Sequence, residues 1–313
     1  MMDTMENKQM RGRCLYTPKG AAREYAAVGC NFYRGCPHGC AYCYNRRGIT
    51  SGTLGGDRPV LMDKFTGMKN RPKSYACLKP EDYAFHCFRQ EMAKDLGYLR
   101  KAGIFLSFTT DPMCEECFTL TWRAADYATA CGVPVRILTK SAEYSFVRKA
   151  LMLALPHERR HLVSVGFTLT GRDDMEPHAG RNAERIESMR WFHGNGFRTF
   201  ASIEPVVDFD SSLAMIREAT ECCSLFLIGL MSGVRKGILR QTGMSGVRKG
   251  YYDRQECARF VLQTYALLES SPLRPKVYWK ESVRRLMKDD ALTMSRIMYA
   301  DNSLNREDYI WDN

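Results

Sequence analysis

Short apolar segments recur along the chain at intervals typical of buried strands separated by helices. Six of them are rich in Val, Ile, Leu and Phe without polar alternation, as expected for strands covered on both faces. A shorter apolar segment, Val277–Trp279, lies nearer the carboxyl end. The six predicted strands are Tyr25–Gly29, Ile104–Phe108, Val133–Leu138, Leu162–Thr168, Arg198–Ile203 and Leu225–Leu230.

Longer segments with helical spacing of apolar residues separate these strands. Gly103, Gly132 and Gly196 each follow such a segment, where glycine commonly ends a helix. Strand–helix alternation predicts an α/β protein with a parallel sheet, either doubly wound or rolled into a barrel. About six units over roughly 210 residues are fewer than the eight units of a complete barrel. The predicted helices are Glu81–Lys101, Leu120–Ala130, Ala142–Leu155, Arg181–His193, Ser211–Thr220 and Asp253–Leu268, with a basic helix after the last strand.

A single domain is expected over residues 24–288, because no change in composition divides that range. Residues 1–23 are interpreted as an N-terminal lead-in, 45–74 as a basic excursion loop and 289–313 as an acidic tail. The sequence MSGVRKG occurs twice, at 231–237 and 244–250. This duplication fits a doubled phosphate-binding loop or a local duplication in a tolerant loop, and we favour the second interpretation.

The overall composition is that of a globular protein. Apolar residues make up 45% of the 313 positions and charged residues 26%, which excludes a disordered chain. No segment approaches the roughly 18 consecutive apolar residues of a membrane span, and the amino-terminal residues have no apolar signal core. We therefore expect a cytoplasmic protein with no membrane partner.

Positive charge is concentrated in three windows. The net charge is +11, and residues 45–74, 231–254 and 271–288 each carry an excess of five basic side chains. Such windows suit a polyanion, DNA or RNA, although solvated loops have the same composition. Aromatic residues interleaved with them are candidate base-stacking surfaces: Phe65, Tyr251, Tyr252, Tyr278 and Trp279.

Three of the thirteen cysteines stand in a C-x3-C-x2-C spacing, Cys36, Cys40 and Cys43, on a Gly- and Pro-containing loop after the first strand. Clustered thiols in a reducing compartment indicate metal or redox chemistry. Thiolate ligands favour iron–sulfur clusters, zinc or copper, and three ligands leave one iron of a four-iron cluster open. The alternative is a closed zinc site with Cys30 or His38 as the fourth ligand, but no second pair of ligands with zinc spacing is present.

The same loop resembles the radical S-adenosylmethionine (radical SAM) superfamily, whose C-x3-C-x-aromatic-C signature is matched by Cys36, Cys40, Tyr42 and Cys43. More narrowly, it resembles the spore photoproduct lyase-like group, often labelled DNA repair photolyases. That group's pattern is matched further by Asn31, Tyr33, Gly35, His38, Gly39 and Tyr44. Other matching segments cover about residues 14–288 in order: YTPKGAAREYA (16–26), TTDPMCEE (109–116), LTKS (138–141), MEPHAGRNAERI (175–186) and SIEPVVD (202–208).

The resemblance implies a partial (β/α)6 TIM-like barrel with a 4Fe-4S cluster held by the three cysteines. The open iron would bind S-adenosylmethionine (SAM), and reductive cleavage would give a 5′-deoxyadenosyl radical that abstracts hydrogen from a substrate. A flavodoxin- or ferredoxin-type electron donor is implied as a partner. The positions that the resemblance assigns to cofactor binding are Tyr42, Tyr44, Thr110, Asp111, Lys140, Ser164, Thr168 and Glu204.

The sequence departs from spore photoproduct lyase at one functional position. That enzyme has a cysteine hydrogen donor just before the second strand's T/S-D motif, where this chain has Phe108 or Thr109. Cys114 and Cys117 follow a few residues later. They are candidates for a replacement donor, for ligands of a second cluster, or for a redox pair whose thiol pKa is lowered at a helix start. Unspecialised thiols are an equally good interpretation of the pair, and the adjacent Cys222 and Cys223 are expected to be core residues.

Two classes of function remain open at this stage. The first is a radical SAM enzyme acting on a nucleic-acid base or on a protein or peptide. The second is a nucleic-acid-binding module with a structural metal and no turnover. Iron rather than zinc in anaerobically prepared protein, with 5′-deoxyadenosine formed from SAM, distinguishes the first from the second.

Overall fold

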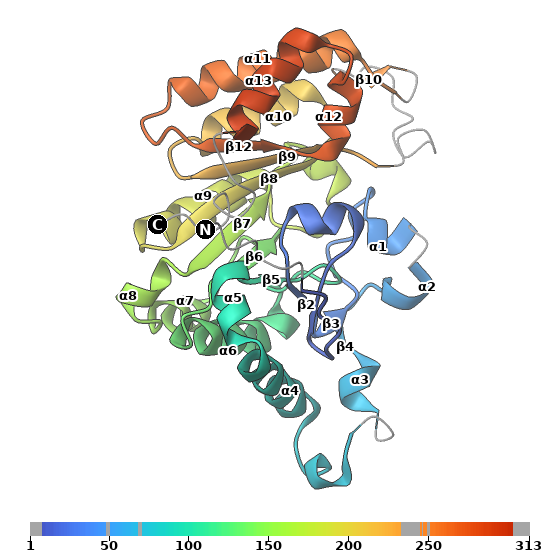
Figure 1. The fold of residues 1–313 in the computed structure, drawn as a ribbon, viewed down its shortest axis with the longest axis vertical. Helices are drawn as coiled ribbons and strands as arrows, with labels where there is room; N and C mark the ends of the chain where they lie inside the picture. Colours follow the sequence, from blue (N-terminus) through green and yellow to red (C-terminus); the bar gives the residue numbers. More distant parts are fainter. Residues whose placement is uncertain are drawn as a thin grey trace.

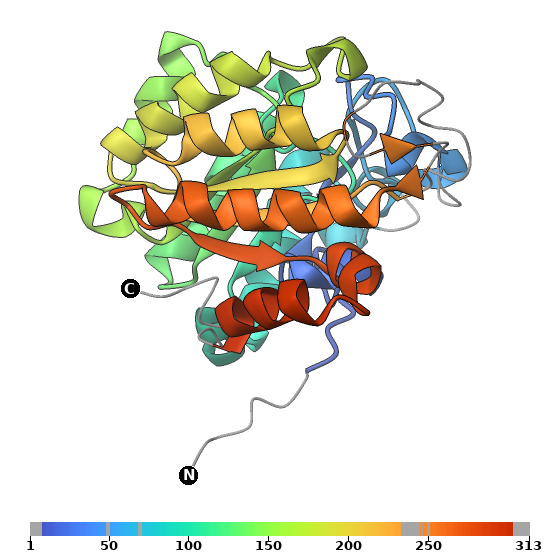
Figure 2. The same ribbon diagram turned by 90° about the horizontal axis from the view of Figure 1, so that it is seen from above.

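The computed structural model describes residues 8–47, 51–67, 71–232, 245, 247–248 and 251–302. Most of the MSGVRKG duplication and the end of the acidic tail lie outside these residues. A curved central sheet is covered by helices packed around it (Figures 1 and 2). None of the helices in the described part of the chain combines the length and the apolar character that crossing a bilayer requires.

The central sheet has eight strands in the order β1-β2-β5-β6-β7-β8-β9-β12. Only β1 is antiparallel to its neighbour, and all the other strand pairs are parallel. The predicted α/β class with a parallel, incompletely closed barrel is therefore confirmed, with β12 as a seventh parallel strand. The strands are β1 (Leu15–Tyr16), β2 (Gly29–Cys30), β5 (Ile104–Leu106), β6 (Val135–Thr139), β7 (Val163–Thr168), β8 (Arg198–Val206), β9 (Leu225–Leu230) and β12 (Lys276–Trp279).

Two short antiparallel pairs lie beside this sheet. The pair nearer the cysteine loop consists of β3 (Tyr33–Arg34) and β4 (Val60–Leu61), and the other of β10 (Val247–Arg248) and β11 (Tyr251–Tyr252). The β3–β4 pair fastens the start of the cysteine loop to the basic excursion.

Helices follow most of the parallel strands, as the alternation predicts. The longer ones are α4 (Pro80–Lys94), α5 (Leu96–Ala102), α6 (Glu115–Ala130), α7 (Phe146–Leu153), α9 (Asn182–Gly194), α10 (Phe209–Ala219), α11 (Arg254–Glu269), α12 (Glu281–Met287) and α13 (Ala291–Asn302). The short ones are η1 (Gly20–Glu24), α1 (Tyr44–Arg47), α2 (Ser51–Leu54), α3 (Asp63–Thr66), η3 (Lys73–Tyr75), α8 (His157–Arg160) and η4 (Asp173–Met175).

Several predicted elements differ from the structure at their ends, and two of these differences have a clear structural cause. The strand predicted over Tyr25–Gly29 is β2 and begins only at Gly29, because Tyr25 caps the turn η1 and its ring packs inside the barrel against Phe105, at a centroid distance of 5.5 Å. The single helix predicted over Glu81–Lys101 is interrupted at Asp95, whose backbone leaves the helical region at φ −127°. Asp95 also forms an ion pair with Lys8 of the amino-terminal segment.

Alternation along the strands separates an outer from an inner layer. Residues such as Ile104, Val135 and Phe226 face the helices in the main core. The intervening residues point into the barrel, where they form a second apolar cluster: Tyr25, Ala26, Phe105, Phe200, Leu225, Leu227 and Tyr278. Because side chains alternate faces with a period of two, this cluster forms a floor, and the next inward positions along each strand lie above it.

Candidate active site

A cavity of about 510 Å³ lies at the carboxyl ends of the parallel strands, above the apolar floor. This is the end at which enzymes with parallel α/β barrels hold their reacting groups. Its lining includes most of the residues predicted from the sequence: Cys36, Cys40, Tyr42, Cys43, Tyr44, Thr110, Asp111, Lys140, Thr168 and Glu204. Ser164, Cys114 and Cys117 are not among the lining residues.

Ser164 lies too far down its strand to reach this cavity. It is buried at the amino end of β7, and the inward position between it and Thr168 is Gly166. The ring of Phe200 fills the space above Gly166, since an added Cβ there would lie 2.1 Å from the Phe200 Cζ atom. The apolar floor thus separates Ser164 from the cavity, and its role in cofactor binding stays a prediction.

The cysteine loop is held by backbone hydrogen bonds to segments distant in sequence. The Cys36 N–H donates to the Gly56 carbonyl at 3.1 Å, and the Ala41 N–H donates to the Met175 carbonyl at 2.9 Å. Gly39 has a φ of +67°, and a Cβ there would lie 3.0 Å from the His178 ring. Glycine is thus required both for the left-handed backbone and for the close approach of residue 178.

The three thiols share one cavity in a partly charged surrounding. Burial is the main cause that raises the pKa of Cys36 to about 12, and burial also raises the pKa of Cys40. The nearby Lys140 opposes this shift at both sulfurs. A bound metal would stabilise the thiolate forms that burial otherwise disfavours.

The donor set fits a cubane cluster better than a single ion. Within the described residues, no three His, Cys, Asp or Glu side chains are grouped so as to hold one metal ion. Each thiolate of a 4Fe-4S cluster binds a different iron, so its three sulfurs need not converge on one point. The cavity that the three cysteines share leaves room for such a cluster.

Both candidates for a fourth zinc ligand are engaged elsewhere. The two ring nitrogens of His38 lie 2.7 Å from Asp111 Oδ2 and 3.1 Å from the His178 carbonyl. Cys30 is buried in β2, paired with Leu15, and does not line the cavity. A closed four-ligand zinc site would have to break these contacts.

Asp111 connects the cysteine loop to two strand ends. Its carboxylate contacts His38 and accepts hydrogen bonds from Thr139 Oγ1, from the Lys140 N–H and from the Met113 N–H, at 2.7–2.9 Å. Burial raises the pKa of Asp111, but His38 and these hydrogen bonds outweigh it and hold the pKa well below its usual value. Because its oxygens already have several protein partners, Asp111 is suited to position the loop, and its contact with a cofactor stays a prediction.

Tyr42 and Lys140 form the adjoining wall of the cavity. The Tyr42 hydroxyl donates to Glu176, and Glu176 forms a fully buried ion pair with Arg185 at 2.7 Å. Lys140 Nζ lies 5.6 Å from the centre of the Tyr42 ring, within cation–π range. Burial lowers the pKa of Lys140, yet the acidic groups of Cys40 and Glu176 raise it above its ordinary value, so the ammonium stays charged.

The opposite wall contains a charged group that the sequence did not reveal. Lys280 Nζ lies 2.5 Å from Glu204 Oε2 and 3.5 Å from Glu24 Oε2, and the lysine is only 1% exposed. The Tyr25 hydroxyl donates to Glu204 and lies 2.7 Å from Ser202 Oγ. In the sequence, Lys280 is one of several basic residues in the window 271–288. The one signal for a role in the cavity was its position directly after the strand β12.

Aromatic residues near the basic windows are mostly buried, contrary to the stacking role proposed for them. Phe65, Tyr278 and Trp279 belong to the core, whereas Tyr251 is 54% exposed. Tyr278 and Trp279 are buried because they lie on strand β12, which is covered on both faces. Of the residues proposed to stack on bases, Tyr251 and the half-buried Tyr252 therefore keep accessible surface.

Cys114 and Cys117 lie behind the cavity wall at the start of α6. Both are buried, and Cys117 Sγ lies 3.8 Å from the hydroxyl of Thr110, which does line the cavity. Hydrogen bonding with Cys117 and burial raise the pKa of Cys114, so the lowering expected from the helix dipole is wrong for this thiol. Cys222 and Cys223 are buried core residues, as predicted.

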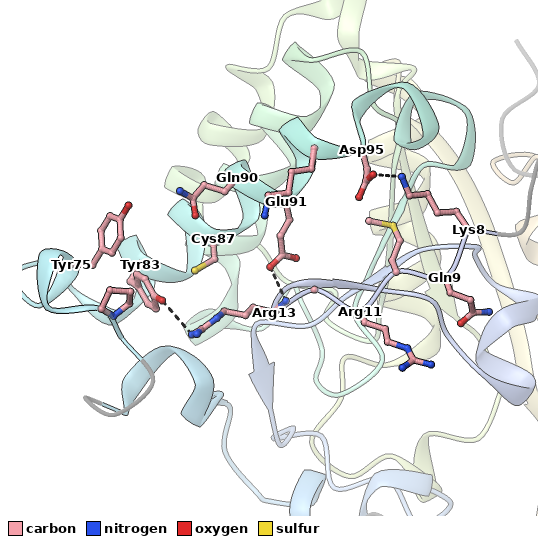
Figure 3. Close-up of a pocket in the computed structure, with 14 residues that line it drawn as sticks. Lys8, Gln9, Arg11, Arg13, Tyr75, Tyr83, Cys87, Gln90, Glu91 and Asp95 are labelled. Atoms are coloured by element: carbon pink, nitrogen blue, oxygen red, sulfur yellow. Dashed lines mark hydrogen bonds and ion pairs between the residues drawn. The ribbon is translucent and has the colours of Figure 1, made fainter.

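A second cavity of about 510 Å³ lies between the amino-terminal segment and α4 (Figure 3). Glu91 occupies its wall and accepts hydrogen bonds from the backbone N–H groups of Arg13, Cys14 and Leu15 at 2.7–3.0 Å. The Arg13 guanidinium in turn donates to the Tyr83 hydroxyl. These contacts attach the lead-in to the barrel, at a place remote from the cysteine loop in sequence.

The curved parallel sheet with a three-cysteine loop at its carboxyl edge has counterparts among solved structures. The fold is similar to that of spore photoproduct lyase complexed with dinucleoside spore photoproduct, with a TM-score of 0.59, 13% identity, and coverage of 84% of this chain and 80% of that chain. A spore photoproduct lyase variant with bound AdoMet and dinucleoside spore photoproduct gives a TM-score of 0.60 at the same identity and coverage.

SuiB from Streptococcus suis, bound to S-adenosylmethionine, matches with a TM-score of 0.48 and 12% identity, over 83% of this chain and 51% of SuiB. No protein-family model matches the sequence, and a search of curated proteins gives no match. The likeness to spore photoproduct lyase confirms the fold implied by the sequence resemblance.

Proposed function

We propose that this protein is a radical SAM enzyme whose cluster is held by Cys36, Cys40 and Cys43. The observation that carries the proposal is the location of all three thiols on one strand-end cavity of this fold, where the nearby His38 already has partners for both ring nitrogens. When bound, a 4Fe-4S cluster with one open iron would supply the electron that cleaves SAM to a 5′-deoxyadenosyl radical.

The chain's own residues hold and shield the reactants. Lys140 presents a charged ammonium to the cavity beside Cys40 and is suited to the carboxylate of SAM. Tyr42 and Tyr44 supply aromatic surface for an adenine ring, and Thr110 and Thr168 supply hydroxyl groups at the strand ends. Glu204 lies on the opposite wall, where a hydrogen-bond donor of the cofactor or the substrate would meet its carboxylate.

The proposed substrate is a nucleic-acid base. Support comes from the fold neighbour that is described in complex with a dinucleoside photoproduct, and from exposed basic and aromatic side chains such as Arg58, Tyr251 and Arg285. A one-electron carrier of the flavodoxin or ferredoxin type is proposed as the reducing partner. Residues 24–288 are proposed to form the catalytic unit, with 45–74 as its excursion.

The test is an anaerobic turnover assay on the purified chain with reconstituted iron and sulfide. Incubation with SAM and dithionite is expected to give 5′-deoxyadenosine, and Cys36→Ala should abolish this product together with iron binding. Cys77→Ala, at an exposed cysteine, is the matched control and should retain both iron binding and product formation.

Lys140→Met should keep the iron and raise the KM for SAM about tenfold or more, because it removes one charge-assisted contact. Wild-type protein that binds iron yet releases no 5′-deoxyadenosine would refute the proposal.

A further inference from the structure

Two groups of contacts divide the strand-end cavity into two halves. One half contains the three cysteines with Tyr42 and Lys140, the groups proposed to hold the cluster and SAM. The other, which we call the η1 half, lies where the turn η1 meets the end of β12. There Glu24 lies 3.5 Å from Lys280 Nζ and accepts a hydrogen bond from the Glu281 N–H at 2.7 Å. The residues that line the cavity in this half are Lys19, Ala21, Ala22, Tyr25, Glu204 and Lys280. Because the cofactor is proposed to occupy the cysteine half, the η1 half is the space open to the substrate.

The carboxylate of Glu204 is built into the η1 half across a glycine. Gly229 belongs to β9, the strand between β8 and β12. A Cβ at Gly229 would lie 2.8 Å from Glu204 Oε1 and 3.0 Å from Lys280 Cδ. Glycine at this position therefore lets the two side chains meet over β9, with Lys280 Nζ 2.5 Å from Glu204 Oε2. The Tyr25 hydroxyl donates to the same carboxylate oxygen.

One oxygen of this carboxylate remains for a ligand. The contacts with Lys280 and Tyr25 both engage Oε2, and within the described residues no protein donor bonds Oε1. The Glu204 side chain is 24% exposed, whereas that of Lys280 is 2% exposed. Glu204 and Glu24 together also carry one more negative charge than the ammonium between them. An anionic oxygen with these properties is suited to accept hydrogen bonds from N–H groups of a substrate.

A cation and an aromatic surface complete the η1 half. Lys19 is exposed, lines the cavity and forms no ion pair in the described part of the chain. It is the N-cap of η1, the turn that also carries Glu24. The floor is formed by Tyr25, Phe105 and Phe108, whose two phenylalanine rings stack at a centroid distance of 4.3 Å. These groups match the parts of a nucleotide: a phosphate for the ammonium, a planar base for the rings, and N–H groups for the carboxylate.

We propose that the η1 half selects a nucleotide whose base carries an amino group, cytosine, adenine or guanine, and that Glu204 determines this specificity. The proposal rests on the function proposed above. An extruded base is recognised by hydrogen bonds to its edge, and the amino groups of these three bases are donors that a carboxylate accepts. Thymine and uracil have a single ring N–H between two carbonyl oxygens, which a carboxylate repels. A site built to accept from an amino group rejects a base that lacks one.

Oligonucleotides that differ in one base test this selection. The probes are fluorescently labelled single strands of thymidine in which the central residue is cytidine, adenosine, guanosine or thymidine. Binding is measured by fluorescence anisotropy on the full-length protein, loaded with its cluster and SAM and kept without reductant so that no turnover occurs. The three strands with an amino-bearing base should bind about tenfold more tightly than the thymidine strand, as expected for one hydrogen bond to a charged group. Equal affinities, or no binding of any strand, would overturn the proposal.

Three variants locate the selection. Glu204→Gln should remove the preference, because its amide both donates and accepts and so accommodates thymine, while its carbonyl still accepts from Lys280 and Tyr25. Glu143→Gln, at an exposed carboxylate outside the cavity lining, is the matched control and should keep the preference. Lys19→Met should weaken all four strands alike, because a phosphate contact carries no base identity. It should also lower the slope of log Kd against log salt by about 0.7.

The outcomes distinguish the substrate role of Glu204 from a cofactor role. A Glu204→Gln protein that keeps the wild-type base preference would overturn the proposal, and a raised KM for SAM in that protein would assign Glu204 to the cofactor. The proposed function has its own readout, the release of 5′-deoxyadenosine by wild-type protein with SAM and dithionite in the absence of oligonucleotide. Wild-type protein that releases 5′-deoxyadenosine and yet binds all four strands equally would refute the base selection alone.

Discussion

At the scale of single residues, the sequence predicted that the three thiols lie together but not which contacts hold their loop. The spacing of Cys36, Cys40 and Cys43 was sufficient to place them together, and they do line one cavity. The role of Asp111 was not predictable, because its partners Thr139 and Lys140 are about 28 residues away along the chain. A short motif shows which residues are near in sequence, whereas this carboxylate acts through contacts that only the fold creates.

Replacing Asp111 with Asn tests its positioning role. Asn keeps the shape of the side chain but loses the charge that faces His38, so the free energy of unfolding at pH 7 should fall by about 3 kcal/mol. The folded-state pKa of Asp111 is lowered, so its stabilisation is complete at neutral pH and is lost as the pH falls below its ordinary value of 3.8. The difference between wild type and variant, measured by urea unfolding, should therefore shrink towards acid pH.

Asp57→Asn provides the control, since the Asp57 side chain is 86% exposed and its ion pair with Arg46 lies on the surface. Its unfolding free energy should change by less than about 1 kcal/mol. Equal effects of the two substitutions would contradict the positioning role of Asp111.

At the scale of elements, periodicity predicted most strands and helices to within a few residues. β9 coincides with its prediction, and β7, β8 and α11 differ only at their ends. Tyr25 was misassigned to a strand because its apolar neighbours match a strand's composition, while its ring packs inside the barrel. The alternation of side chains along each strand predicts which residues face into the barrel. It does not predict how far along the strands the apolar floor ends, because that depends on the Phe200 ring filling the space above Gly166.

A pair of glycine substitutions tests this packing. Gly166→Ala would place a Cβ against the Phe200 ring, so it should lower the free energy of unfolding by about 1–3 kcal/mol through overpacking. Gly97→Ala, in α5, meets no atom within 4 Å and should raise it by about 0.5–1 kcal/mol, because alanine favours the helix. Thermal unfolding of the two variants checks the signs. Stabilisation by Gly166→Ala would refute the close contact that forms the floor.

At the scale of the whole molecule, the barrel is not closed by strand pairing. β1 and β12 are the two edges of the sheet, so the ladder of hydrogen bonds ends at each. Glu24, which ends the turn η1 before β2, reaches across to the β12 side. It accepts from the Glu281 N–H at 2.7 Å and lies 3.5 Å from Lys280 Nζ. This contact was invisible in the sequence, since its partners lie at opposite ends of the chain.

A double-mutant cycle on Glu24 and Lys280 measures this closure. Lys280→Met leaves two partly buried carboxylates without their cation and should cost about 3 kcal/mol of unfolding free energy, near the lower end for a buried ion pair. Combining it with Glu24→Gln should be less than additive, with a coupling of about 1–3 kcal/mol. The exposed Arg285–Glu281 pair should couple by less than about 0.5 kcal/mol. Fully additive effects at Glu24 and Lys280 would show that the contact does not close the barrel.

The central claim, a four-iron cluster held by three cysteines with one open iron, is tested most directly by electron paramagnetic resonance of the anaerobically reduced protein. The account predicts the signal of a reduced 4Fe-4S cluster that changes shape when SAM is added, because SAM occupies the open iron. A protein that carries zinc in place of iron, or a cluster signal that SAM leaves unchanged, would contradict it.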